Sequence, residues 1–264
     1  MDLNLAGRTA LVSGSTVGIG YATAEGLAGL GARVIVNGRT AARVAAAAAA
    51  IKSKYPRAEV DEAPYDLSDA VGTVALVAAF PSVDIVVNNL GIFEPKAFEE
   101  IPDADWLRFF ETNVMSGIRL SRAYLPYLRA RNWGRIIFVS SESGINIPAE
   151  MVHYGMTKTA QLAVARGIAE TVAGTGITVN SVLPGPTRSE GVAAFVGQLA
   201  KHRGVSADEM EREFFATARP TSLLKRFATV DEVANMIVYL CTPAASATNG
   251  SSVRVDGGVV KTIV

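Results

Sequence analysis

The sequence predicts an α/β fold built on one doubly wound parallel sheet, and three observations support this prediction. Short apolar segments alternate with helical segments from one end of the chain to the other. The first apolar segment runs directly into a glycine-rich turn, and no linker or break in composition divides the 264 residues. A chain of this length can bury a sizeable core within one α/β domain. We therefore expect about seven strands with helices on both faces of the sheet, in a single domain spanning residues 1–264.

Composition and charge exclude several classes of protein. Lys plus Arg equals Asp plus Glu at 25 each, so no overall field favours nucleic acid or an anionic membrane. Cys241 is the one cysteine, which excludes an internal disulfide and fits a reducing compartment. The N-terminus lacks the basic region and apolar core of a signal peptide, and no apolar run reaches membrane-spanning length. We expect a soluble, cytoplasmic protein without a nucleic acid or membrane partner.

A strand, a glycine-rich turn and a helix follow one another near the start of the chain. Thr9–Ser13 is a short apolar run, typical of a buried parallel strand. It leads into the turn Gly14–Gly20, of sequence GSTVGIG, and then into a helix expected over Tyr21–Leu30. Glycines let the backbone approach a pyrophosphate closely, and the helix N-terminus offers free N–H groups to it. This context predicts a Rossmann-type dinucleotide site.

The remaining elements are expected in regular alternation. Further strands are expected at Arg33–Asn37, Glu59–Ala63, Val83–Val87, Arg135–Ser140, Ile177–Leu183 and Ser252–Val255. Helices are expected at Thr40–Ser53, at Val71–Phe80 with Ser68 as its cap, from Pro102 through Asn113 toward Arg131, at Met151–Ala173, and from a Thr229/Glu232 capping box through Leu240. Glu190–Ala218 is mixed and charged, as in a pair of surface helices inserted after a strand. Ligands of such sheets bind at the carboxyl ends of the strands.

Three residues near the middle of the chain indicate proton transfer. Tyr154 and Lys158 are spaced i,i+4 on a predicted helix, so their side chains share one face. A phenol titrates near ~10 in water, and a neighbouring ammonium is expected to lower that pKa. Ser141 follows the fifth strand, where its hydroxyl could hydrogen-bond an oxygen held by Tyr154. The pair alone is weak evidence, because i,i+4 pairs also occur on solvated helix faces.

Taken together, the motifs resemble the classical short-chain dehydrogenase/reductase family over essentially the whole chain, and within it the 3-oxoacyl-[acyl-carrier-protein] reductases. The resemblance identifies Asn113, Ser141, Tyr154 and Lys158 as the catalytic residues. It implies that Tyr154 exchanges a proton with the substrate oxygen while a hydride moves to or from the nicotinamide. Ser141 then orients that oxygen, Lys158 also holds the nicotinamide ribose, and Asn113 fixes a water that relays protons to solvent. The matching cofactor-binding positions are Gly14, Ser15, Thr16, Gly18, Ile19, Gly20, Asp66, Leu67, Asn89, Gly91, Tyr154, Lys158, Pro184, Gly185, Thr187 and Ser189.

The choice of cofactor depends on the residues after the second strand. An NAD site usually presents a carboxylate there, which bonds the ribose 2′-hydroxyl and repels a 2′-phosphate. Gly38 occupies that position and Arg39 follows, so a guanidinium replaces the carboxylate. Against NADP, the turn residues Ser15–Val17 include no basic side chain. We predict NADP as the cofactor, with NAD possible, and expect no metal.

Two side chains beside the catalytic positions have open roles. Glu142 follows the catalytic serine, where its carboxylate could bind a substrate cation or face solvent. His153 precedes Tyr154, and it is expected either as a partly exposed neighbour on the first turn of the helix or as a polar group of the substrate pocket. The sequence also departs from the family pattern at Leu90, where alanine is usual.

We expect the substrate to be a small carbonyl compound or alcohol, whose identity the sequence leaves open. Apolar residues that could face its pocket suggest a mainly apolar molecule: Ile92, Phe93, Ile145, Ile147 and Met151. By resemblance, residues 186–222 form the variable substrate loop, in which Phe195, Phe214 and Phe215 either line an apolar pocket or pack the inserted helices on the sheet. Two other functions are alternatives: a non-catalytic dinucleotide sensor, and an NAD-dependent secondary alcohol dehydrogenase. The resemblance also implies a homotetramer, or a homodimer.

Overall fold

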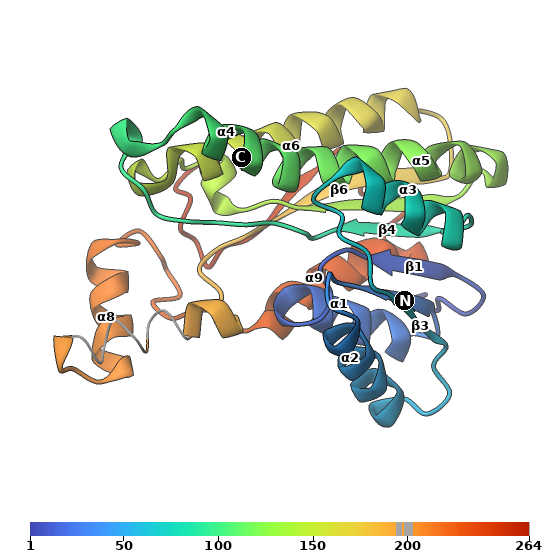
Figure 1. The fold of residues 1–264 in the computed structure, drawn as a ribbon, viewed down its shortest axis with the longest axis horizontal. Helices are drawn as coiled ribbons and strands as arrows, with labels where there is room; N and C mark the ends of the chain where they lie inside the picture. Colours follow the sequence, from blue (N-terminus) through green and yellow to red (C-terminus); the bar gives the residue numbers. More distant parts are fainter. Residues whose placement is uncertain (194–196, 198–202, 264) are drawn as a thin grey trace.

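A seven-stranded parallel sheet organises the computed structural model, which describes residues 1–193, 197 and 203–263 (Figure 1). The strand order is β3-β2-β1-β4-β5-β6-β7, so the direction of winding reverses between β1 and β4. The strands are β1 (Thr9–Val12), β2 (Arg33–Asn37), β3 (Val60–Ala63), β4 (Ile85–Asn88), β5 (Gly134–Val139), β6 (Ile177–Pro184) and β7 (Ser252–Val255). The predicted fold class is confirmed.

Helices cover both faces of the sheet. Those of the described residues are α1 (Gly18–Gly29), α2 (Ala41–Lys54), α3 (Ala70–Ala79), α4 (Asp103–Phe110), α5 (Ser116–Arg131), α6 (Val152–Thr171), α8 (Ala207–Thr217) and α9 (Val230–Cys241). Figure 1 shows α1, α2 and α9 on one side of the sheet, and α3, α4, α5 and α6 on the other. The α8 segment projects beyond the sheet, at one end of the molecule.

The residues of the central strands are buried on both faces because these strands lie between two helical layers. In β2, Val34 and Val36 pack in the cluster that contains α1, α2 and α9, whereas Ile35 packs with α3 and α5 on the opposite face. Ile85 and Val86 of β4 divide between the same two clusters. This alternation explains why the strands are continuous apolar runs in the sequence.

Most helix ends differ from the predicted ones by one to three residues, and two helices differ in their cap or their continuity. The helix expected to be capped by Ser68 begins instead with Asp69, whose carboxylate accepts the N–H of Gly72 at 2.8 Å. The long helix expected from Pro102 to Arg131 is interrupted by a π-helical turn over Glu111–Met115, which separates α4 from α5. Such turns often occur at functional sites, and this one carries Asn113.

The C-terminal elements agree closely with prediction. Thr229 and Glu232 form the expected reciprocal capping box at the start of α9, and β7 has the predicted bounds. In the inserted loop, α8 also begins with a capping box, made by Ser206 and Glu209. None of the helices in the described ranges combines the length and the apolar character needed to cross a bilayer.

Candidate active site

The glycine-rich turn lies between the end of β1 and the start of α1. Gly14 and Gly18 have φ of 61° and 64°, a region that L side chains rarely adopt. A Cβ on Gly20 would lie 2.4 Å from the Asn89 amide nitrogen and 2.5 Å from the Gly14 carbonyl oxygen. Val17 precedes α1 without any side-chain cap, so the first N–H groups of the helix have no partner within it. The turn is therefore shaped to hold an anionic group.

Two asparagines, the buried Asn37 and the half-buried Asn89, hold this turn in place. Asn89 donates to the carbonyl oxygens of Ser13 and Gly14, each at 3.0 Å. Asn37, at the end of β2, accepts the N–H of Gly14 at 3.1 Å and donates to the carbonyl of Ala63 at 2.9 Å. Sequence reasoning assigned Asn89 to cofactor contact and missed Asn37. An asparagine at the carboxyl end of an apolar strand was the signal that could have identified it.

A shallow pocket of about 150 Å³ lies beyond the turn, at the carboxyl ends of β1, β2 and β3. The predicted residues Arg39, Asp66 and Leu67 all line it, together with Thr16 and Leu90. Arg43, which the sequence analysis did not single out, lines it too, one turn after Arg39. The pocket wall therefore includes two exposed guanidinium groups: Arg43 lies in the first turn of α2, and Arg39 lies two residues before the helix begins.

The segment after β6 lies close to the phosphate turn. A Cβ on Gly18 would be 3.7 Å from the Cβ of Ser189, which places Ser189 against the start of α1. Thr187 is buried, and its hydroxyl donates to the carbonyl of Gly185 at 2.9 Å. A Cβ on Gly185 would meet the backbone oxygen of Asp256 at 2.5 Å, so only glycine fits there. Pro184 is the last residue of β6, so this segment follows directly from a strand.

Ser141 and Tyr154 form the polar centre of the site. Ser141 follows β5 as the cap of a short 3₁₀ turn, and its hydroxyl accepts the N–H of Ser143 at 3.1 Å. Tyr154 lies in the first turn of α6. Burial raises the pKa of Tyr154 to about 12, and the Glu142 charge adds to this increase, whereas Ser141 and the Arg219 charge oppose it. The two predicted residues are therefore brought together.

Lys158 lies one turn after Tyr154, with its ammonium 5.6 Å from the centre of the phenol ring. The ammonium donates to the carbonyl of Val139 at 3.0 Å and to the amide oxygen of Gln161 at 3.3 Å. Burial lowers the pKa of Lys158 to about 7. The expected lowering of the Tyr154 pKa by this ammonium is wrong for this structure, because burial dominates both groups and their pKa values move apart instead.

Asn113 lies in the π-helical turn behind Lys158. Its side-chain oxygen accepts the N–H of Ile92 at 2.7 Å, and its amide nitrogen donates to the Ile92 carbonyl and the Thr157 hydroxyl, each at 3.0 Å. The side chain thus links the segment after β4 to α6. A Cβ on Gly91 would lie 3.4 Å from the Lys158 ammonium, so Gly91 brings that segment directly against the lysine.

Glu142 is 3% exposed and is paired with a cation of the protein itself. Arg219, from the loop after α8, donates from Nε to one carboxylate oxygen at 3.0 Å. Arg219 also reaches Glu150 at 3.3 Å. Burial raises the pKa of Glu142, and the Arg219 charge partly opposes this. The expectation that Glu142 faces solvent is wrong, and the cation that it binds here is Arg219, a residue that sequence reasoning missed.

His153 is fully buried, so both expectations for it are wrong. Its ring packs on Phe109 of α4, with ring centroids 4.0 Å apart, and against Trp106 at 6.0 Å. Neither ring nitrogen has a hydrogen-bond partner in the described residues. Burial lowers the pKa of His153, so the imidazole is a neutral part of the packing between α4 and α6.

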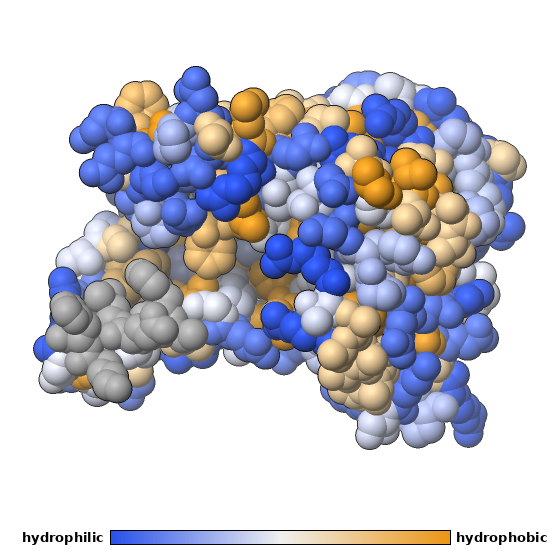
Figure 2. Space-filling model, viewed as in Figure 1, coloured by the Kyte–Doolittle hydropathy of each residue, from blue (hydrophilic) through white to orange (hydrophobic). Residues whose placement is uncertain are grey.

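The entrance to the site is apolar. Phe93 is 54% exposed and lies edge-on to Tyr154, with ring centroids 6.4 Å apart. Ile145 and Ile147, between Ser141 and α6, are also exposed. Figure 2 shows this face of the molecule hollowed between the α4–α6 layer and the α8 segment, with hydrophobic surface around the hollow. Phe93, Ile145 and Ile147 are three of the residues that the sequence predicted to face the substrate pocket.

The phenylalanines of the inserted loop have a packing role. The ring centroids of Phe214, Phe215 and Phe227 lie 5.1–5.2 Å apart, and the cluster includes Met210. Phe214 and Phe215 therefore join α8 to the segment before α9. They have a packing role, but their partners belong to the inserted loop and the segment after it, whereas the packing alternative placed these side chains on the sheet. Phe195 lies outside the described residues.

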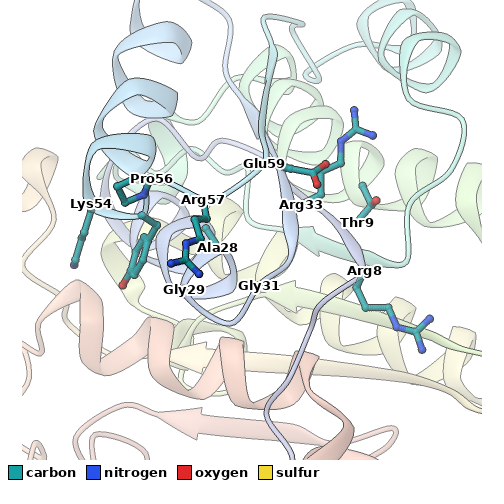
Figure 3. Close-up of a pocket in the computed structure, with 13 residues that line it drawn as sticks. Arg8, Thr9, Ala28, Gly29, Gly31, Arg33, Lys54, Pro56, Arg57 and Glu59 are labelled. Atoms are coloured by element: carbon teal, nitrogen blue, oxygen red, sulfur yellow. The ribbon is translucent and has the colours of Figure 1, made fainter.

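A second, larger pocket of about 560 Å³ lies at the opposite edge of the sheet, near the amino ends of β1 and β2 (Figure 3). Arg8 points away from the other labelled side chains and stacks on Trp133 at 3.7 Å. Arg33 pairs with Asp61 at 2.6 Å, and Lys54 pairs with Glu25. Because these cations are already partnered, the polar site at the carboxyl edge is the stronger candidate for catalysis.

Comparisons with known proteins find oxidoreductases that match nearly the whole chain. The model of the family described as enoyl-(acyl carrier protein) reductase matches residues 14–260. The uncharacterized oxidoreductase YvaG of Bacillus subtilis (strain 168) is 45% identical over 263 residues, covering 100% of both chains. D-beta-hydroxybutyrate dehydrogenase of Cupriavidus necator is 33% identical, covering 97% of this chain and 99% of its own. The crystal structure of L-sorbose reductase from Gluconobacter frateurii, complexed with NADPH and L-sorbose, is 32% identical with a TM-score of 0.93 and full coverage of both chains.

These relatives cover the whole length of the chain, and its motifs lie in the geometry described above. The chain therefore belongs to the short-chain dehydrogenase/reductase family of oxidoreductases.

Proposed function

We propose that this protein is an NADP(H)-dependent oxidoreductase that interconverts a small hydroxylated ketone and its secondary alcohol. The observation that carries the proposal is the placement of Lys158 beside Tyr154, with its ammonium 5.6 Å from the centre of the phenol ring, while Ser141 is close enough to the phenol to oppose the rise of its pKa. These groups lie at the same edge of the sheet as the glycine-rich turn. A proton donor is thus held beside a site for a dinucleotide.

The residues present fit a bound dinucleotide. The unpaired N–H groups of Gly18, Ile19 and Gly20 would hold its pyrophosphate, because a helix N-terminus favours an anion. Gly14, Ser15 and Thr16 would line the same turn, and Asp66 and Leu67 would contact the adenine end. Asn89, Gly91, Pro184, Gly185, Thr187 and Ser189 would surround the nicotinamide end. When bound, the nicotinamide supplies or accepts the hydride.

The protein's own contribution is to place and move one proton. With a pKa of about 12, Tyr154 keeps its phenolic proton at neutral pH and can donate it to a carbonyl oxygen as charge develops there. Ser141 stabilises the same oxygen with its hydroxyl. A protonated Lys158 beside the phenol stabilises the phenolate that remains. In the oxidative direction the same groups accept the proton.

The pocket beyond the turn supports NADP over NAD. Arg39 and Arg43 both line it, and arginine pairs well with the 2′-phosphate that distinguishes NADP. A carboxylate at position 38 would be obstructed, because a Cβ on Gly38 would lie 2.6 Å from the Thr16 methyl group. The sequence-based preference for NADP is therefore supported by the shape of the pocket as well as by its charge.

The substrate proposal rests on charge near the phenol and on one relative. Glu142 and Glu150 outnumber Arg219 in the ion-pair network behind Ser141, so the network does not favour a negatively charged substrate. L-Sorbose, the ligand of the similar reductase from Gluconobacter frateurii, is a neutral hydroxylated ketone. The exposed Phe93, Ile145 and Ile147 would cover the apolar side of such a molecule.

We also propose that residues 186–222 are the substrate loop of a single domain, and that the protein acts in the cytoplasm.

We further propose that the protein forms a homotetramer. A groove between α5 and α6, lined by Ile118, Leu125, Val164 and Ile168, supports self-association through these helices. Size-exclusion chromatography with light scattering tests the tetramer, and a monomer at micromolar concentration would contradict it.

The first experiment is a titration of the purified protein with NADPH and with NADH, followed by nicotinamide fluorescence. We expect tighter binding of NADPH. Turnover is then measured with a panel of neutral ketoses and hydroxyketones, with β-keto acids as matched charged competitors. Reduction of a neutral member at the higher kcat/KM supports the proposal. Tight binding without turnover across the panel would favour a dinucleotide sensor, and a preference for keto acids would overturn the substrate class.

A further inference from the structure

Gln161 lies on the same face of α6 as the catalytic pair. It follows Tyr154 by seven residues and Lys158 by three, so all three side chains share one stripe of the helix. Gln161 is 1% exposed. A long polar side chain is rarely buried this deeply unless its amide is hydrogen-bonded at both ends.

Both ends of the Gln161 amide are used. The nitrogen donates to the backbone carbonyl of Asn113 at 2.5 Å, and the oxygen accepts from the Lys158 ammonium at 3.3 Å. Asn113 belongs to the π-helical turn, where the regular helical hydrogen-bond pattern is interrupted. The Gln161 side chain therefore bridges this turn to Lys158.

The Lys158 ammonium depends on neutral acceptors. The carbonyl of Val139 comes from β5, Gln161 from α6, and Gly91 approaches from the segment after β4. Tyr154 is the titratable group that faces it, and among the described residues no carboxylate contributes to its pKa. A buried ammonium is costly unless such acceptors hold it. Gln161 is the acceptor that a point mutation can remove.

We propose that Gln161 is a positioning residue, whose amide holds the Lys158 ammonium in its charged form and aims it at Tyr154 by anchoring it to the Asn113 carbonyl. The role of this bridge rests on the proposed function, in which Lys158 assists the proton transfer by Tyr154. The bridge itself is a property of the fold and can be measured without any substrate.

The test is a direct titration of Lys158. Protein labelled with ¹³C at the lysine ε-carbon is titrated by NMR, and the Lys158→Met variant identifies the Lys158 signal. In Gln161→Leu, a side chain of similar size without the amide, we expect the Lys158 midpoint to fall by about one pH unit, because a hydrogen bond to a charged group is lost. In Gln161→Glu, an opposite charge replaces the amide oxygen, and the midpoint should rise above that of the wild type.

Ser140→Ala is the matched control. The Ser140 hydroxyl donates to the backbone carbonyl of Lys158 at 2.8 Å but does not contact the ammonium, so its loss should leave the midpoint in place. An unchanged midpoint in Gln161→Leu overturns the proposal, as does an equal fall in Ser140→Ala. If Gln161→Leu does not fold, Gln161→Glu decides the matter, because an upward shift supports the bridge and an unchanged midpoint refutes it. Shifts as expected in a protein without turnover would leave the bridge intact and refute only the proposed function.

Discussion

The nucleotide half and the catalytic half of the site are held together by different forces. The glycine-rich turn is fixed by neutral amides: Asn37 and Asn89 satisfy its backbone, and Ser13 accepts the N–H groups of Asn89 and Leu90 at 2.9 and 3.0 Å. Around Tyr154, by contrast, the protein buries ionisable side chains. Lys158 and Glu142 are 4% and 3% exposed, yet no described hydrogen bond or ion pair joins one to the other.

This difference follows from what each half does. A turn that binds an anion needs only oriented N–H groups, which neutral amides can hold at little cost in desolvation. A proton donor needs a shifted pKa, and burial is how the protein shifts it. We therefore expect mutations in the catalytic half to change rate and pH dependence, and mutations in the nucleotide half to change affinity.

The largest effect is expected from Tyr154→Phe. Removing the phenolic oxygen eliminates the proton donor, so kcat should fall by about 10²–10⁴-fold. The phenol is not part of the glycine-rich turn, so the Kd for NADPH should change by less than about threefold, equivalent to ~0.6 kcal/mol. Stopped-flow turnover and fluorescence titration of the same preparation measure both quantities. An unchanged kcat would remove Tyr154 from the mechanism.

The next largest effect is expected from breaking the buried ion pair between Arg219 and Glu142. Arg219→Met leaves the Glu142 carboxylate buried without its partner, and the free energy of unfolding should fall by about 3 kcal/mol. The folded-state pKa of Glu142 is raised by burial, so its contribution to stability is present below the unfolded value of about 4.3 and is lost as pH rises through the folded value. The decrease in the free energy of unfolding caused by Arg219→Met should therefore be larger at pH ~8 than at pH ~5.

Urea unfolding of the wild type and of Arg219→Met at both pH values measures this change in the free energy of unfolding. The matched control is Arg219→Met combined with Glu142→Gln, which removes the buried charge and should recover part of the stability at the higher pH. Equal destabilisation at the two pH values would show that Arg219 acts through packing alone.

A smaller effect is expected in the nucleotide half. Arg39→Asp replaces a cation that lines the pocket with an anion that repels a 2′-phosphate. The ratio of Kd values for NADPH and NADH should move toward NADH by about tenfold, equivalent to ~1.4 kcal/mol. Arg57→Asp makes the same change of charge in the pocket at the opposite edge (Figure 3) and should leave the ratio unchanged. Identical ratios in wild type and Arg39→Asp would contradict an NADP site.

The smallest effect concerns His153, next to the catalytic tyrosine. Burial lowers its folded-state pKa below the unfolded value of about 6.5, so its contribution to stability is lost as pH falls through that unfolded value. His153→Phe keeps an aromatic ring against Phe109 and removes the proton site. The loss of stability between pH ~6.5 and ~5.5 should shrink by up to about 1 kcal/mol, measured by urea unfolding at each pH. The same pH slope in both proteins would show that other groups cause the acid sensitivity.

Much of the fold and the candidate site could be predicted from local sequence. Apolar runs bounded by glycine fixed the strands to within a few residues, since parallel strands are buried on both faces. The turn from Gly14 to Gly20 was recognisable because only glycine tolerates its φ angles and close contacts. Tyr154 and Lys158 were paired correctly, since helical spacing alone places them on one face.

What the sequence could not supply depends on residues that are distant along the chain. Arg219 meets Glu142 across 77 positions, and Gln161 meets Asn113 across 48. The pKa shift of Tyr154 was assigned the wrong direction because its sign depends on how deeply the phenol is enclosed, which helical spacing does not encode. The sequence by itself determined the order of the elements and the identity of the candidate catalytic groups, because both follow from local pattern. Only the tertiary structure decided which charges are buried and what holds them, because desolvation and long-range hydrogen bonds exist only once the elements have packed.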